Sequence, residues 1–81
     1  MAKLLKNGTF GYNIQCLRRS CGLTQEQTVA QLQILGSPLS RSTYSLIEMG
    51  RGNVYVSDLV ALQKIFNVDF SAFFENIPTS R

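Results

Sequence analysis

The stretch LSRSTYSLIEMGRG, residues 39–52, carries the side chains best suited to recognition chemistry. On a helical wheel, Tyr44 and Ile47 face one side, with Leu39 just before them. The opposite side collects an arginine, two serines and two apolar side chains: Arg41, Ser42, Ser45, Leu46 and Met49. Arginine can bind guanine, serine can bond to base edges or phosphates, and apolar side chains can meet thymine methyl groups. The pattern favours a helix that enters a DNA major groove, although the same face would also suit a protein partner.

Catalytic chemistry has little support in the composition. The chain has two cysteines and no histidine, and its five acids are scattered. Cys16 and Cys21 would point to different sides of one helix, so we expect reduced thiols, with no histidine to activate either. The glycines form no phosphate-binding loop. We therefore expect no enzyme, no metal site, no cofactor and no small-molecule ligand.

The bulk properties describe one small domain. At 81 residues the chain can bury only a modest core, and its net charge is +3. The charge is uneven, because residues 1–53 hold six bases and two acids while residues 54–81 hold two bases and three acids. Such a distribution would suit one face that meets a polyanion, or it is ordinary surface charge. No apolar run is long enough for a membrane span and the first residues do not read as a secretory signal, so we expect a cytoplasmic protein.

The elements that must position these side chains are five short helices, which makes the fold class all-α. Phe10, Ile14, Leu17 and Cys21 form the apolar stripe of the first, and Thr28, Leu32 and Leu35 form the inner stripe of the second. Ser40, Ser57 and Asp69 are expected to cap the third, fourth and fifth. No window alternates long enough for a strand. The five helices are expected at about residues 9–21, 25–35, 41–49, 58–66 and 70–77.

The second and third helices predict a helix-turn-helix. Thr24 and Gln27 form a capping box, which starts the second helix at Gln25. In this motif the first helix crosses the DNA backbone and the second enters the groove. The free amides at Gln25 would suit a phosphate, and capping alone is the plainer interpretation of the same residues.

Nearly the whole chain, from about Phe10 to Phe74, resembles the Cro and phage-repressor type of helix-turn-helix regulators, also called the xenobiotic-response-element family. The resemblance implies a compact five-helix lambda-repressor-like DNA-binding domain without a cofactor. The matching residues are Ile14, Leu17-Arg18, Gly22-Leu23-Thr24-Gln25-Glu26-Gln27, Leu32, Ser40-Arg41-Ser42-Thr43, Ile47-Glu48, Gly50, Leu59-Val60-Ala61-Leu62 and Val68.

The resemblance also implies roles for individual residues. The base-reading positions would be Arg41, Ser42, Ser45 and Leu46. The phosphate-binding positions would be Gln25, Thr43, Arg51 and Asn53. Arg18 and Glu48 would form a partly buried structural ion pair that ties the first helix to the end of the third.

Three departures from the family pattern affect the placement of the third helix. The turn at residues 33–38 is about four residues longer than usual, so the tilt of the helix is open. Thr28 replaces a leucine and Val29 a small alanine, which predicts a wider crossing with Thr28 bonded back to the Thr24 carbonyl. Met49 replaces a basic or polar residue, which would remove one phosphate contact.

We expect a sequence-specific transcriptional regulator, a repressor in the first instance, that binds double-stranded DNA as a homodimer. The alternative is a protein-interaction module, such as an antitoxin or anti-repressor, that keeps the fold. Phe74 and Ile77 are the candidate dimer contacts, unless these side chains complete the monomer core, as expected for Phe70 and Phe73. We divide the chain into an N-terminal arm (1–8), the helix-turn-helix domain (9–77) and a C-terminal tail (78–81).

Overall fold

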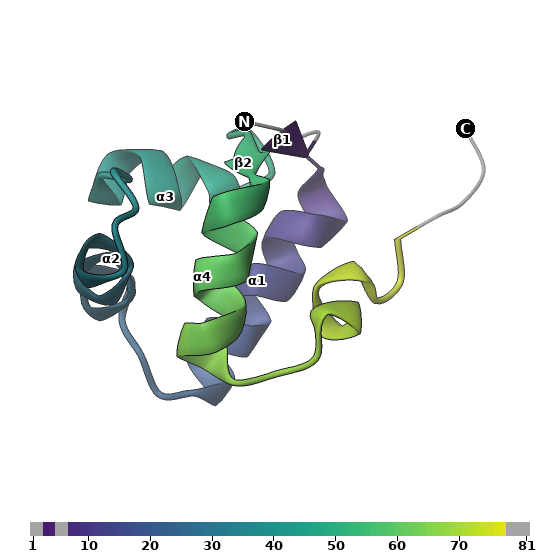
Figure 1. Ribbon diagram of the computed structural model, residues 1–81. Helices are drawn as coiled ribbons and strands as arrows, with labels where there is room; N and C mark the ends of the chain where they lie inside the picture. Colours follow the sequence, from purple (N-terminus) through teal and green to yellow (C-terminus); the bar gives the residue numbers. More distant parts are fainter. Residues whose placement is uncertain (1–2, 5–6, 78–81) are drawn as a thin grey trace.

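The computed structural model describes residues 3–4 and 7–77 of the chain, and this part is mostly helical (Figure 1). Four α-helices are followed by one 3-10 helix, and two short strands pair antiparallel, Lys3 with Tyr55 and Leu4 with Val54. The elements in chain order are β1 (Lys3–Leu4), α1 (Gly8–Ser20), α2 (Gln25–Ile34), α3 (Arg41–Glu48), β2 (Val54–Tyr55), α4 (Val56–Phe66) and η1 (Phe70–Phe74).

Local capping explains most helix boundaries. The capping box predicted for α2 is confirmed, since Thr24 accepts from the Gln27 amide and the Gln27 side chain accepts from the Thr24 amide. Ser40 caps α3 as predicted. Asn67 ends α4 in the left-handed conformation, with φ of 54°. The cap of α1 was missed: the Asn7 side chain accepts from the Phe10 amide, and the helix begins at Gly8.

Three predictions about the elements were wrong. The fifth helix is a 3-10 helix of five residues, closed by a bond from the Ala72 amide to the Asp69 carbonyl, and so is too short for an α-helical ladder. Ser57 does not cap α4, because β2 leads directly into a helix that starts at Val56 with Tyr55 in the cap position. The β1–β2 pair was not expected, since two residues per strand are too few for a visible alternation.

One hydrophobic core joins all the helices. It contains Phe10, Ile14, Val29, Leu32, Leu39, Tyr44, Ile47, Val54, Leu59, Ala61, Leu62, Phe66 and Phe73. Three apolar residues expected inside are exposed instead: Cys21, Leu35 and Phe70. Cys21 and Leu35 are the C-caps of α1 and α2, where the helical phase of each stripe ends. Phe70 begins η1 at the edge of the core, with its ring centroid 6.5 Å from that of the buried Phe73.

A close backbone approach joins the start of α1 to the end of α3. A side chain at Gly11 would place its Cβ 2.3 Å from the Ile47 carbonyl oxygen and 2.8 Å from the Gly50 nitrogen. A Cβ at Gly50, whose φ is +76°, would meet Gly8. Two glycines are therefore required here for packing, and the crossing they permit determines where α3 ends relative to α1.

The side chain of Asn13, on α1, is hydrogen-bonded to the backbone at the end of η1. The Asn13 amide donates to the carbonyl oxygens of Phe73, at 3.0 Å, and of Glu75, at 2.8 Å. The ring of Phe74 stacks on Phe10 with centroids 5.4 Å apart. These contacts determine the position of the C-terminal aromatic residues on the surface of α1.

Candidate nucleic-acid interface

The outer face of α3 holds the predicted base-reading side chains. Tyr44 and Ile47 are fully buried on the inner face and Leu39 is buried just before the helix, so packing fixes the rotation of α3. Packing therefore supplies the helical stability that a serine- and threonine-rich sequence lacks. On the outer face Ser45 is half-buried, and the exposed side chains are Arg41, Ser42, Leu46 and Met49.

The N-terminal end of α2 adjoins this face. Gln25, Arg41, Ser42 and Ser45 line one shallow hollow of about 290 Å³. The Arg41 guanidinium lies 3.3 Å from the Glu26 carboxylate, and both side chains are largely exposed. An exposed ion pair of this kind contributes little to stability and is readily exchanged for another partner.

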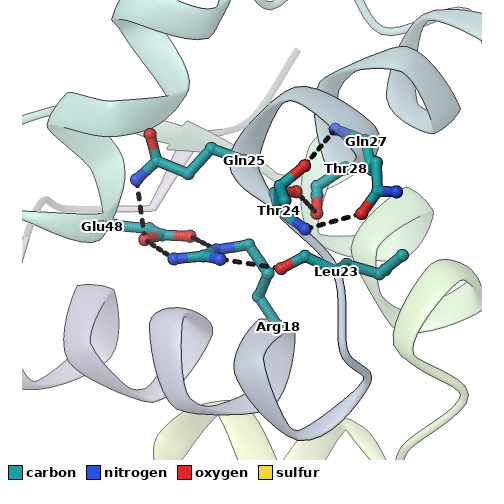
Figure 2. Close-up of polar contacts among 7 residues, drawn as sticks. All are labelled: Arg18, Leu23, Thr24, Gln25, Gln27, Thr28 and Glu48. Atoms are coloured by element: carbon teal, nitrogen blue, oxygen red, sulfur yellow. Dashed lines mark hydrogen bonds and ion pairs between the residues drawn. The ribbon is translucent and has the colours of Figure 1, made fainter.

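A buried ion pair between Arg18 and Glu48 lies at the centre of a hydrogen-bond network that joins α1, α2 and α3 (Figure 2). The Arg18 Nε donates to Glu48 Oε2 at 2.6 Å, and its Nη2 donates to Glu48 Oε1 at 3.1 Å. The Arg18 Nη1 also donates to the Leu23 carbonyl at 2.8 Å. The Gln25 Nε2 donates to Glu48 Oε1 at 3.0 Å. The carboxylate at the end of α3 is therefore bonded from both α1 and the first residue of α2.

Arg18 and Glu48 shift each other's pKa values. Burial raises the pKa of Glu48, but hydrogen bonds from Arg18 and Gln25, together with the nearby Tyr44 hydroxyl, outweigh burial and leave the pKa below its usual value. The hydrogen bond to Glu48 is the main cause of a raised pKa for Arg18. The pair therefore stays ionised at neutral pH in spite of its burial.

The Tyr44 hydroxyl is buried beside the same pair. Burial, followed by the neighbouring Glu48 carboxylate, raises its pKa far above the usual value. Among the described residues, however, none is placed to make a well-formed hydrogen bond with this hydroxyl. Its effect on Glu48 is therefore that of a nearby dipole and not of a firm bond.

The predicted phosphate-binding residues border the two ends of α3. Thr43 is exposed in the first turn, where its hydroxyl accepts from the Ser40 hydroxyl at 3.0 Å. Arg51 and Asn53 are exposed in the turn beyond Gly50, which is held by bonds from the Arg51 and Gly52 amides to the Leu46 carbonyl. Gln25 differs from these three, because its side chain is half-buried and already bonded to Glu48.

The long turn before α3 is attached to α4. The Ser37 hydroxyl donates to the buried Asp58 carboxylate at 2.9 Å and also accepts from the Leu39 amide at 3.4 Å. Leu39 is buried directly after the turn. The predicted bond from the Thr28 hydroxyl to the Thr24 carbonyl is present at 2.9 Å. The entry of α3 is thus determined by Asp58, a residue to which the sequence analysis gave no role.

The side chains of the candidate dimer contacts are only partly exposed. Phe74 is 45% exposed although its ring stacks on Phe10, and Ile77 is half-buried against the core. Phe70 is as exposed as Phe74, which places two aromatic rings of η1 on the surface.

Sequence reasoning missed three side chains around the site. Glu26 was seen only as part of a motif, and its pairing with Arg41 depends on how α2 and α3 cross. Asp58 could have been noticed as an acid in the first turn of α4, where the helix dipole favours negative charge. No pattern in the sequence assigns Arg19 to the site. In the structure Arg19 borders a second hollow of about 510 Å³, which Gln25 and Arg41 also line.

Two classes of site find no support in the residues that the structure describes. Within ranges 3–4 and 7–77, no three potential ligands gather as a metal would require. In the same part of the chain, no helix combines the length and hydrophobicity of a membrane span.

The helix pair α2–α3, with α3 packed through one face and open on the other, defines a helix-turn-helix domain. The fold is similar to a solved structure, that of the restriction-modification controller protein C.AhdI from Aeromonas hydrophila. That likeness has a TM-score of 0.71 at 25% sequence identity, and covers 83% of this chain and 94% of the other. No protein-family model matches the sequence, and a search of curated proteins found no match.

Proposed function

We propose that this chain is a sequence-specific DNA-binding transcriptional regulator that inserts α3 into the major groove. The observation that carries the proposal is the outer face of α3, where a long bidentate donor, small hydroxyls and an apolar side chain lie together: the exposed Arg41, Ser42 and Leu46 and the half-buried Ser45. These side chains match the donors, acceptors and methyl groups of base edges. Similarity to a restriction-modification controller protein supports a regulatory role.

The residues bordering α3 would bind the DNA backbone. Thr43, Arg51 and Asn53 are exposed near its two ends, and Gln25 lies at the start of α2. Phosphate contacts of this kind position a protein on the duplex without reading its sequence. Arg41 would leave Glu26 on binding, because guanine offers it two acceptors in place of one exposed carboxylate.

We further propose that the regulator is a repressor and acts as a homodimer on a two-fold-related site. A dimer would place two recognition helices about one DNA turn apart, roughly 34 Å. Phe74 and Ile77 are the proposed contacts, and the ring of Phe70 on η1 is exposed as well. A transcriptional activator would use the same DNA-binding face, so a reporter gene is needed to distinguish repression from activation.

The first test is the binding of a random DNA duplex as a function of salt concentration. A real DNA-binding face should lose affinity steeply as salt rises, because counterions are released from the phosphates on binding. A flat response would contradict the proposal. Selection from random duplexes, followed by sequencing, would then give the site, and a two-fold-symmetric site would support the dimer.

The second test separates base reading from general attraction. Arg41→Ala should lose about 1–3 kcal/mol on the selected site and relax the preference at one base pair. Lys64→Ala is the matched control, since Lys64 is an exposed cation in the last turn of α4. The C-terminal end of α4 lies away from α3 (Figure 1). An equal loss on every sequence would make Arg41 a phosphate contact.

A protein-interaction module remains the second candidate because of two exposed apolar side chains on α3. Leu46 is 43% and Met49 57% exposed, and both would pack well against a protein partner. Leu46→Ser would weaken a protein complex and leave the salt-dependent binding of random DNA nearly unchanged.

A further inference from the structure

The Gln25 side-chain amide is bonded on one side and open on the other. Its Nε2 carries two hydrogens, and one of them is donated to Glu48 Oε1 at 3.0 Å. In a planar amide the second N–H is directed away from that bond, and none of the described residues accepts it. Gln25 also lines the hollow with Arg41, Ser42 and Ser45. Gln25 therefore has a bonded donor that fixes its position and a second donor available to a ligand.

The partner that fixes Gln25 is itself rigidly held. Both Glu48 oxygens accept from Arg18, at 2.6 Å and 3.1 Å, and the carboxylate is buried (Figure 2). Arg18 is fixed in turn by the Leu23 carbonyl. Glu48 thus has little freedom to move when a ligand approaches, and the hydrogen bond to Glu48 holds the Gln25 side chain in place as well.

A surface glutamine without such a partner samples many rotamers and loses that freedom when it binds. A glutamine held before binding loses less, which is the general advantage of preorganisation. The neighbouring Gln27 shows a different arrangement, since its side chain is bonded to the backbone of Thr24 within the capping box. Of the two glutamines, Gln25 is the one fixed by a residue of α3.

We propose that Glu48, held by Arg18, is a positioning residue for DNA binding: it orients the Gln25 amide so that the second N–H meets a backbone phosphate. This inference rests on the proposed function, since it requires DNA as the ligand. It gives the buried pair a role beyond joining α1 to α3, because the state of Glu48 then controls a contact made by α2.

The test compares two backgrounds that differ in one acceptor. R18M/E48M and R18M/E48Q both remove the ion pair without leaving a buried charge alone, but only the glutamine at position 48 can still accept from Gln25. Q25A is then added to the wild type and to each background, and the dissociation constant for a random duplex is measured at one salt concentration. A random duplex is used because the proposed contact carries no base preference.

We expect Q25A to weaken binding about tenfold in the wild type and in R18M/E48Q, the effect of one hydrogen bond to a charged phosphate. In R18M/E48M the same change should cost less than twofold, because Gln25 is no longer positioned there. Equal losses in all three backgrounds would overturn the inference. Absence of salt-dependent binding by the wild type would instead contradict the proposed function, so the two failures are distinguishable.

A measurement on the unmodified protein keeps the inference testable if the double variants do not fold. Relaxation of the side-chain NH₂ groups reports their order by NMR in the absence of DNA. The Gln25 amide should be ordered, in contrast to that of the exposed Gln31 on the same helix. Equal mobility of the two amides would show that Glu48 does not position Gln25.

Discussion

The replacement of Gly11 by alanine tests the close crossing of α1 and α3. The added Cβ would lie 2.3 Å from the Ile47 carbonyl oxygen and 2.8 Å from both the Glu48 carbonyl oxygen and the Gly50 nitrogen. Real Cβ contacts essentially never fall below 3.0 Å, so the two backbones must separate by at least about 0.7 Å. All three neighbours are backbone atoms, and none can yield by changing a rotamer.

Two opposing terms decide the size of the effect. Alanine in place of an interior helical glycine stabilises by about 1 kcal/mol. Overpacking costs about 1–3 kcal/mol, occasionally more, and three backbone contacts place Gly11 at or beyond the upper end. We expect a net loss of about 2 kcal/mol, which corresponds to a fall in Tm of about 8–16 °C for a domain of this size.

The assay is thermal and urea unfolding followed by circular dichroism. Gly8→Ala is the matched control. Gly8 lies on the same helix as Gly11, and a Cβ there would meet nothing within 4 Å. Its stability should stay unchanged or rise by up to about 1 kcal/mol. If Gly11→Ala were as stable as the wild type, the α1–α3 crossing would be wider than described and the packing argument would fail.

Three further predictions concern buried polar groups. The pKa of Glu48 is lower in the folded state, so its contribution to stability is complete above the unfolded-state pKa, about 4.3, and is lost as pH falls through the lower folded value. The urea midpoint of R18M/E48M should therefore fall less on acidification than that of the wild type, and parallel curves would contradict this. Tyr44→Phe should leave Tm unchanged or raise it, because none of the described residues makes a well-formed hydrogen bond with the hydroxyl; a loss above about 1 kcal/mol would indicate one. Ser37→Ala should destabilise by about 2 kcal/mol in urea unfolding, since the buried Asp58 carboxylate loses a partner, and a neutral result would refute that role.

Much of the fold could be predicted because the interactions that define it are local. The capping box at Thr24 and the cap at Ser40 each involve residues a few positions apart. The burial of Tyr44 and Ile47 follows from helical periodicity. Periodicity gave the wrong burial at the helix ends. Leu35 is the C-cap of α2, where the chain leaves the helix and the side chain no longer follows the apolar stripe.

The candidate site could also be predicted only in part from the sequence. Which side chains of residues 41–49 face outward followed from periodicity, since the inner face is apolar. That Glu26 pairs with Arg41, and that Gln25 bonds to Glu48, did not follow. Each of these contacts depends on how α2 and α3 cross after the long turn, and the residues of that turn carry no periodic signal.

The sequence by itself determined the helical segments, their caps and the outward face of α3, because hydrogen bonds and side-chain spacing within one turn depend only on near neighbours. The tertiary structure alone decided the crossing at Gly11, the attachment of η1 by Asn13 to a carbonyl 60 residues away, and the link from Arg18 through Glu48 to Gln25. Such contacts join residues that are distant in sequence, so they exist only once the helices have packed.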